Sequence, residues 1–202
     1  MANNVVTVGM IGCGGFQRYR LGNLFKVKEA KVVALVDPDT EQIQKTIEAY
    51  PQLADCPVFE DYRQMLKGVK PDAVMIATPH TQHADQIVDS FEAGAHVCCE
   101  KPLVTTVKDA HRVIEARDKA GKVGLVSYQR HYQPEYRYIR EKIQNGEAGK
   151  VQFVSAIQEQ GWLKATSGTW RQKLSLSGGG QLNDSASHLL DVILWVTGLQ
   201  AR

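Results

Sequence analysis

The sequence predicts an α/β fold: a doubly wound parallel sheet, followed by an incomplete α+β domain with a mixed sheet. β-branched runs alternate with helix-length segments through the first 127 residues, as in a parallel sheet covered on both faces. A glycine-rich loop follows the first run, and after Ser127 the pattern changes to one alternating segment and helices. We therefore expect one domain over residues 1–127 and a second over 128–202.

The expected strands of the first domain are short runs rich in Val, Ile and Ala. They are Val5–Ile11, Lys31–Asp37, Pro57–Phe59, Asp72–Thr78, His96–Glu100 and Lys122–Ser127. Helices are expected between them, at Phe16–Val27, Thr40–Tyr50, Asp61–Lys67, Gln82–Ala93 and Val107–Ala120. Three of these helices run into a glycine, which is a common residue at a helix end.

The second domain lacks the regular alternation of strands and helices expected in the first. Pro134 is well placed to begin a helix over Glu135–Asn145. Val151–Gln160 alternates apolar and polar residues, which predicts a half-buried strand. The glycine-rich turn Ser177–Gly180 then leads to a helix over Asp184–Val196. One strand and a few helices cannot bury an apolar sheet face, so this domain looks truncated.

Composition excludes several function classes. The 202 residues are 43% hydrophobic and 23% charged with a net charge of +2, and no run of Lys or Arg exceeds two residues. These values argue against a nucleic-acid partner. No apolar stretch reaches membrane-spanning length, and no secretory signal is evident. The four cysteines read as reduced, buried groups, which favours the cytoplasm, and no metal site is expected.

The glycine loop after the first strand has the sequence Gly12-Cys13-Gly14-Gly15-Phe16-Gln17. Gly12 permits a tight turn, and Gly14 lets the backbone approach a pyrophosphate. The helix that follows turns its N-terminal N–H groups toward that anion. Gln17 stands where a third glycine is usual, which puts the contact between helix and strand in question. We expect Gly12, Gly14, Gly15, Phe16 and Gln17 to contact a dinucleotide.

Asp37 ends the second strand, 25 residues after Gly12. A carboxylate at this place can accept hydrogen bonds from the adenosine ribose hydroxyls. Its charge would repel a 2′-phosphate, and its neighbours Pro38 and Asp39 offer no cation, so NAD is favoured over NADP. The alternative is that Asp37 is only a turn residue.

Three further segments point to a family. They are Thr78-Pro79-His80-Thr81-Gln82-His83, Glu100-Lys101-Pro102, and Gly178-Gly179-Gly180 leading to Asp184-x-x-x-His188-x-x-Asp191. In this order, and with the glycine loop, they resemble the Gfo/Idh/MocA oxidoreductases. The resemblance implies a Rossmann domain followed by an α+β domain on a large mixed sheet. It also implies NAD(P)-dependent redox chemistry on a sugar, cyclitol or related polyol.

The resemblance assigns roles to individual residues. It implies that Thr78, Pro79 and His83 line the nicotinamide side of the cleft, and that Trp170 and Arg171 lie near the cofactor. Glu100 and Lys101 match the family's Glu-Lys-Pro, and His80 stands where many members have Asn. We take all of these as cofactor-binding candidates, and Lys101, Asp184 and His188 as catalytic candidates.

The catalytic candidates also make chemical sense. Oxidation of a secondary alcohol needs a hydride acceptor and a base, and histidine has an ordinary pKa suited to that proton. Asp184 and His188, four residues apart, would share one helix face. Lys101 follows a strand's C-terminal end, where its ammonium could stabilise alkoxide charge. The alternatives are a structural His188 and a solvated Lys101. Asp191 reads as structural, and His131 could face substrate.

Three functions remain open from the sequence. The first is a dehydrogenase acting on a sugar or polyol, as a homo-oligomer. The second is a redox-assisted glycosidase or lyase, in which NAD would be reduced and reoxidised within one cycle. The third is a truncated, non-catalytic NAD(H)-binding form, because family members carry a longer second domain.

Overall fold

The computed structural model describes residues 5–201 and divides the chain into two compact units, Met1–Val126 and Ser127–Arg202. The first unit is built on six strands. These are β1 (Val6–Ile11), β2 (Ala30–Val36), β3 (Val58–Phe59), β4 (Ala73–Ile76), β5 (His96–Cys99) and β6 (Gly124–Val126). Every neighbouring pair is parallel, and the order across the sheet is β3-β2-β1-β4-β5-β6. This is the strand order of the Rossmann fold, which confirms the predicted fold class.

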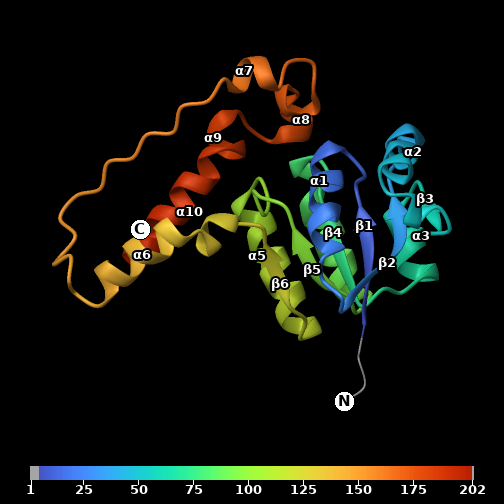
Figure 1. Ribbon diagram of the computed structural model, residues 1–202, viewed down its shortest axis with the longest axis horizontal. Helices are drawn as coiled ribbons and strands as arrows, with labels where there is room; N and C mark the ends of the chain where they lie inside the picture. The colour runs from blue at the N-terminus through green and yellow to red at the C-terminus, as the bar shows by residue number, and fades with distance from the viewer. Residues whose placement is uncertain (1–4, 202) are drawn as a thin grey trace. The chain divides into compact units, whose positions relative to one another are not determined.

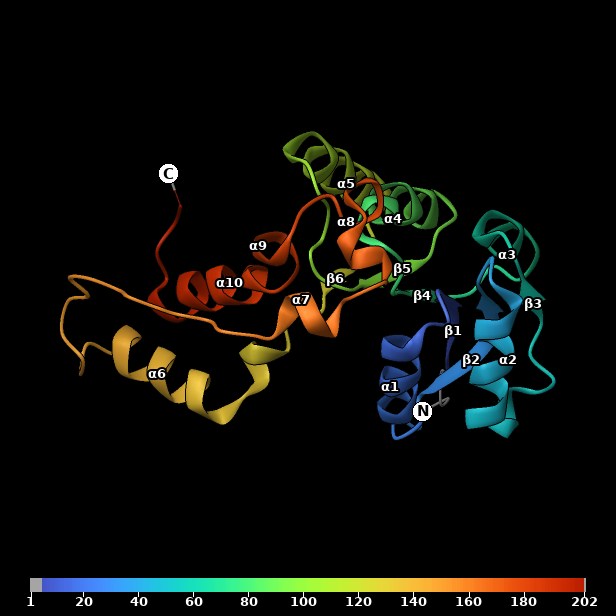
Figure 2. The same cartoon turned by 90° about the horizontal axis from the view of Figure 1, so that it is seen from above.

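Helices cover both faces of this sheet (Figures 1 and 2). They are α1 (Gly15–Leu24), α2 (Thr40–Ala49), α3 (Tyr62–Gly68), α4 (His83–Glu92) and α5 (Val107–Ala120), with the 3₁₀ turns η1 (Pro51–Leu53) and η2 (His80–Gln82). Side chains of α1 and α2 share one buried cluster with Met10 and Leu35, whereas those of α3, α4 and α5 share another with Ile11 and Ile76. The core is therefore two apolar layers separated by the sheet.

Local sequence fixes the helix ends. The Asp39 side chain accepts from the N–H of Glu41 at the start of α2, and Asp61 does the same for Arg63 at the start of α3. Thr106 caps α5, which ends at Gly121 in the left-handed conformation. The helix expected over Phe16–Val27 begins one residue earlier and stops at Leu24, where the chain turns toward β2.

The second unit consists of helical segments joined by loops. They are η3 (Gln129–Tyr132), α6 (Pro134–Gln144), α7 (Trp162–Ala165), η4 (Trp170–Gln172), α8 (Leu174–Ser177), α9 (Gln181–Asp184) and α10 (Ala186–Thr197). The helix α6 packs on α10, with the Arg140 guanidinium 4.7 Å from the centre of the Trp195 ring. Pro134 does begin α6, as expected.

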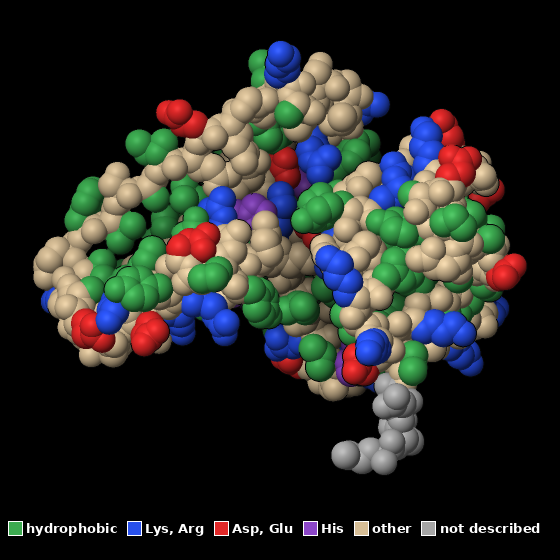
Figure 3. All heavy atoms as spheres, in the orientation of Figure 1, with side chains coloured by type: hydrophobic (Ala, Val, Ile, Leu, Met, Phe, Trp, Pro, Cys, Tyr) green, Lys and Arg blue, Asp and Glu red, His purple; other side chains and the backbone are tan. Residues whose placement is uncertain are grey.

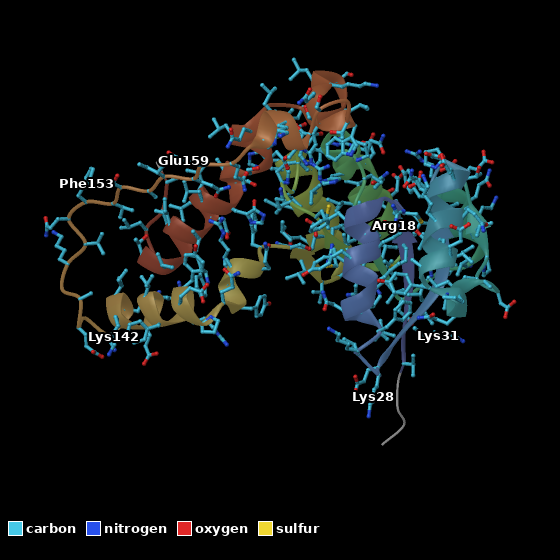
Figure 4. The ribbon with its side chains drawn as sticks, turned by 45° about the horizontal axis from the view of Figure 1, so that its top comes forward. Arg18, Lys28, Lys31, Lys142, Phe153 and Glu159 are labelled. Carbon is cyan, nitrogen blue, oxygen red and sulfur yellow. The ribbon has the colours of Figure 1, made fainter. Side chains whose placement is uncertain are left out.

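Two sequence expectations for this unit are wrong. The segment Val151–Gln160 forms no strand, because residues 127–201 contain no partner strand whose backbone could pair with it. Phe153 and Ile157 are therefore exposed. Apolar side chains are visible on the surface of the second unit (Figure 3), and Phe153 is labelled on this loop in Figure 4. The helix expected over Asp184–Val196 is interrupted at Ser185, so Asp184 ends α9 while His188 lies in α10.

Candidate functional site

The glycine loop lies at the carboxyl end of β1. Gly12 has φ +88°, and a Cβ atom there would lie 2.8 Å from the carbonyl oxygen of Ala77. Only glycine satisfies both the backbone conformation and the close approach. A Cβ atom on Gly14 would meet nothing within 4 Å, so the space in front of the N-terminus of α1 is open. This is the arrangement that accommodates an anion at a helix N-terminus.

Asp37 ties this loop to the end of β2. Its Oδ2 accepts the N–H of Cys13 at 2.8 Å, and its Oδ1 accepts the N–H of Asp39 at 2.9 Å. The carboxylate thus shapes both turns. Each oxygen keeps acceptor capacity beyond one bond, so these contacts are compatible with ribose binding as well.

Cys13 is structural. It is fully buried, and its Sγ lies 3.6 Å from the carbonyl oxygen of Val36. Burial, with a smaller contribution from the charge of Asp37, raises the pKa of the thiol to about 12. The thiol therefore stays protonated and unreactive near neutral pH.

Gln17 explains how the helix tolerates the missing third glycine. Its side chain is 1% exposed beneath α1, and its Nε2 donates to the carbonyl oxygen of Met75 in β4 at 3.2 Å. A hydrogen bond to the strand replaces the close contact that glycine would allow. Gln17 therefore joins helix and sheet, and its amide faces the core rather than the open side of the loop.

Arg18 was missed by sequence reasoning, although it stands in the first turn after the loop (Figure 4). Its Nη1 donates to the carbonyl oxygen of Cys13 at 2.6 Å and to Oε1 of Gln42 at 3.2 Å. Its Nη2 lies 3.8 Å from the place of a Cβ on Gly15. The side chain is thus a cation folded over the glycine loop. Phe16, by contrast, is a half-exposed residue on α1.

A pocket of about 380 Å³ opens beside the loop, between the carboxyl ends of β1, β2 and β4. This volume is in the range of small-molecule sites. It is lined by Ile11, Gly12, Val36, Pro38, Glu60, Asp61, Tyr62, Arg63, Thr78, Thr81, Gln82, Asp85 and Gln86. Two of its walls are fixed by hydrogen bonds. Thr78 Oγ1 donates to Gln86 Oε1 at 2.6 Å, and the Tyr62 hydroxyl donates to Asp89 at 2.7 Å.

The segment after β4 places Thr78 in this pocket, whereas the two histidines that follow are buried. His83 lies with Nε2 3.0 Å from the carbonyl oxygen of Thr78 and Nδ1 2.9 Å from that of Pro102. Burial lowers the pKa of His83, so the ring is neutral near pH 7. Its side chain lies between these two loops and does not line the open pocket. Pro79 precedes η2, and His80 packs edge-on against His83 at 5.8 Å.

The Glu100-Lys101-Pro102 segment follows β5 directly, and its Lys101–Pro102 peptide is cis. Glu100 is buried and forms an ion pair with Arg20 of α1, at 2.7 Å. The other carboxylate oxygen accepts the N–H of Lys101 at 3.3 Å. The backbone of Lys101 is therefore held at the end of β5 by Glu100, which is itself paired with Arg20.

The remaining candidates belong to the second unit. Asp184 is 4% exposed, and its Oδ2 accepts from Trp162 Nε1 at 2.8 Å and lies 3.4 Å from Arg171 Nε. The Arg171 guanidinium in turn covers the Trp170 ring at 4.5 Å. Asp184, Trp170 and Arg171 thus form one cluster, together with Trp162, which no sequence pattern indicated.

His188 lies on α10, edge-on to the Tyr128 ring at 5.8 Å. One turn further, Asp191 contacts His131 Nε2 at 2.8 Å, and the His131 ring stacks on Trp195 at 4.4 Å. Burial raises the pKa of Asp191, opposed by the neighbouring His131. Asp191 and His131 are therefore a paired, packed unit, consistent with the structural reading of Asp191.

The first unit fits a dinucleotide. The Gly12 turn, the open space before α1 and the pocket beside Asp37 are the shapes that a pyrophosphate and an adenosine ribose require. Residues 5–201 hold no group of three or more His, Cys, Asp or Glu side chains arranged for a metal ion. No helix within the described chain is long and apolar enough to cross a membrane.

Comparison with known families decides the classification. Residues 6–128 match the model described as the oxidoreductase family with an NAD-binding Rossmann fold, and residues 136–202 match the GFO/IDH/MocA C-terminal domain. The chain belongs to the GFO/IDH/MocA oxidoreductase family. Its first unit is an NAD-binding Rossmann domain of this family.

Individual members of the family are also similar to this chain in sequence. The chain is 29% identical over its whole length to D-glucoside 3-dehydrogenase of Escherichia coli (strain K12), of which it covers 56%. It is 32% identical to an inositol 2-dehydrogenase of Rubrobacter xylanophilus over 71% of this chain and 41% of that protein. It thus spans about half the length of the curated relatives it matches.

A solved structure extends the comparison to three dimensions. The WlbA dehydrogenase of Bordetella pertussis, in complex with NADH and UDP-GlcNAcA, matches 97% of this chain and 56% of its own with a TM-score of 0.83 and 26% identity. A scyllo-inositol dehydrogenase of Lactobacillus casei has the same fold, with a TM-score of 0.81 at 24% identity over 96% of this chain and 56% of that one.

Proposed function

We propose that this protein transfers a hydride between a nicotinamide cofactor and a secondary alcohol carbon of a sugar, cyclitol or related polyol. The observation that carries the proposal is Lys101, held at the carboxyl end of β5 in a Rossmann domain of this family. The names of the relatives, a glucoside dehydrogenase and an inositol dehydrogenase, support the substrate class.

In this proposal the chain supplies binding and proton transfer. The glycine loop and Asp37 hold the dinucleotide, whose nicotinamide supplies the hydride acceptor. The ammonium of Lys101 donates a hydrogen bond to the substrate oxygen and stabilises negative charge developing there. His188 accepts the hydroxyl proton. Asp184, held by Trp162 and Arg171, supplies a negative charge in the same unit as His188.

The proposal includes a preference for NAD over NADP. Asp37 lies against the glycine loop, and Glu60, Asp61 and Asp85 add negative charge around the adjoining pocket. A 2′-phosphate would meet this charge at close range. Two cations lie nearby: Arg18, whose Nη1 donates to Cys13 and Gln42, and Arg63, which lines the pocket and pairs with Asp89 at 2.9 Å.

We also propose that the protein is cytoplasmic and homo-oligomeric. The four cysteines are free thiols, as expected in a reducing compartment. Apolar side chains exposed along residues 151–160, among them Phe153 and Ile157, favour self-association.

The test is a panel of inositols, glucosides and sugar acids with NAD and NADP, assayed on the 202-residue chain and on two variants. Lys101→Met and His188→Ala should each lower kcat by about 10²- to 10⁴-fold while NAD affinity persists. The matched controls are Lys108→Met and His111→Ala, both on α5, which should leave kcat unchanged.

Three results would contradict parts of this proposal. Near-normal turnover by the His188→Ala variant would remove its role as base. Cleavage of glycosides without net NADH formation would favour the redox-assisted glycosidase or lyase. Saturable NAD binding with no turnover of any panel member would favour a non-catalytic NAD(H)-binding protein.

A further inference from the structure

The backbone on the N-terminal side of Lys101 is anchored by a nearly buried ion pair. Arg20 on α1 and Glu100 after β5 meet at 2.7 Å between Nη1 and Oε1, with 15% and 10% of their side chains exposed. The second carboxylate oxygen accepts the Lys101 N–H at 3.3 Å. Glu100 therefore links the helix that follows the glycine loop to the backbone of Lys101.

Arginine suits this position better than lysine. Besides the ion pair, Arg20 Nη2 donates to Cys98 Sγ at 3.2 Å, so one planar guanidinium engages two residues of the same strand end. A lysine ammonium could pair with Glu100 but could not hold both groups in a fixed geometry. The contacts to Cys98 and Glu100 thus define the direction in which the chain leaves β5.

The C-terminal side of Lys101 is anchored independently. His83 on α4 lies 2.9 Å from the carbonyl oxygen of Pro102 and 3.0 Å from that of Thr78. A neutral imidazole donates from one ring nitrogen, so it bonds one of these carbonyls in each tautomer. Since His83 is fully buried, the ring cannot move away without opening the packing around it.

We propose that Arg20 and His83 are positioning residues that hold the backbone of Lys101 from its two sides. The inference rests on the proposed role of Lys101 and deepens it. Arg20 connects the glycine loop's helix to Glu100, and His83 of α4, when protonated on Nδ1, donates to the carbonyl oxygen of Pro102 at 2.9 Å. With its backbone held in place, Lys101 can position its ammonium precisely, as a hydrogen-bond donor to the substrate must be.

The first test measures the anchoring without activity. Amide hydrogen exchange of the peptide spanning residues 98–104 should become at least about tenfold faster in Arg20→Met and in Glu100→Gln. Arg20→Lys should restore part of the protection, and His83→Leu should also speed exchange. The control Lys28→Met removes one exposed positive charge at the other end of the unit (Figure 4). The exchange of peptide 98–104 in this variant should match the wild type.

The second test separates positioning from general structure. With a substrate from the polyol panel, Arg20→Met should lower kcat at least about tenfold, with KM and the NAD dissociation constant within about twofold of wild type. Arg20→Lys should recover part of kcat. Variants whose circular dichroism or melting temperature show global unfolding are replaced by Glu100→Gln, which removes only the charge.

The outcomes distinguish this inference from the proposed function. Unchanged exchange at residues 98–104 in Arg20→Met would overturn the inference, as would unchanged kcat. If the wild type turns over no panel member, the proposed function fails. The exchange result then decides by itself whether Arg20 and His83 hold this segment.

Discussion

Gly12 shows how a single residue determines the site. It combines a left-handed backbone with a Cβ position 2.8 Å from the Ala77 carbonyl oxygen. Gly14 has neither restriction, and its value lies in the open space in front of it. The first glycine is therefore needed for folding of the loop, whereas the second borders open space in which we propose that the dinucleotide binds.

Gly12→Ala should cost about 1–3 kcal/mol of unfolding free energy and weaken NAD binding at least about tenfold. The matched control is Gly68→Ala at the end of α3, where φ is not positive and no atom lies within 4 Å of the new methyl group. It should be neutral or slightly stabilising. Urea unfolding and NADH titration check both. Equal effects of the two substitutions would contradict the strain argument.

At the scale of elements, β1 and β4 are joined at their amino ends by Thr7 and Asp72. Asp72 Oδ2 accepts from the Thr7 N–H at 2.8 Å and from its hydroxyl, and the Asp72 N–H donates back to Thr7 Oγ1 at 2.9 Å. These hydrogen bonds hold the pKa of Asp72 below its ordinary value. The pairing should therefore stabilise the fold above that ordinary pKa and cease to do so in acid.

Asp72→Asn should accordingly be less stable than wild type at neutral pH. Because the folded pKa is depressed, the difference should shrink as the pH falls from about 4 through the folded pKa. Urea unfolding between pH 7 and pH 2 measures it. A difference that stayed constant with pH would show that the carboxylate charge plays no part.

The segment 151–160 shows where sequence periodicity fails. Alternation predicts a strand, but a strand forms only where a partner supplies backbone hydrogen bonds. Phe153 is 84% exposed here, whereas Phe91 in the core is 2% exposed. Phe153→Ala should change unfolding free energy by less than about 0.5 kcal/mol, and Phe91→Ala should cost about 3–5 kcal/mol. A loss above about 2 kcal/mol at Phe153 would mean that this segment is buried.

At the scale of the whole molecule, the sequence was most informative where local rules and tertiary packing agree. The six strands and their helices were predicted from apolar runs and from glycines at helix ends, and the structure adds caps at Asp39, Asp61 and Thr106. The glycine loop and Asp37 were predictable because spacing along one strand–helix–strand unit, β1-α1-β2, determines their proximity. Sequence patterns predicted one helix over Asp184–Val196. They did not predict its interruption at Ser185, which separates Asp184 from the helix of His188.

Residues that act across the fold were not predictable in this way. The pairing of Arg20 with Glu100 joins positions 80 residues apart, and that of Trp162 with Asp184 joins positions in separate helical segments. Neither has a periodicity or a spacing that a single sequence displays. The Gln17 amide likewise needed the position of the Met75 carbonyl oxygen to be understood.

The central claim is that the first unit holds NAD(H) on its glycine loop beside Asp37. The most direct measurement is titration of the full chain with NADH and, separately, NADPH, followed by nicotinamide fluorescence and calorimetry. The account predicts saturable binding of one NADH per chain, tighter than NADPH, and at least about tenfold weaker in Gly12→Ala. Absence of saturable NADH binding at millimolar concentration, by a chain that is folded by circular dichroism, would contradict it.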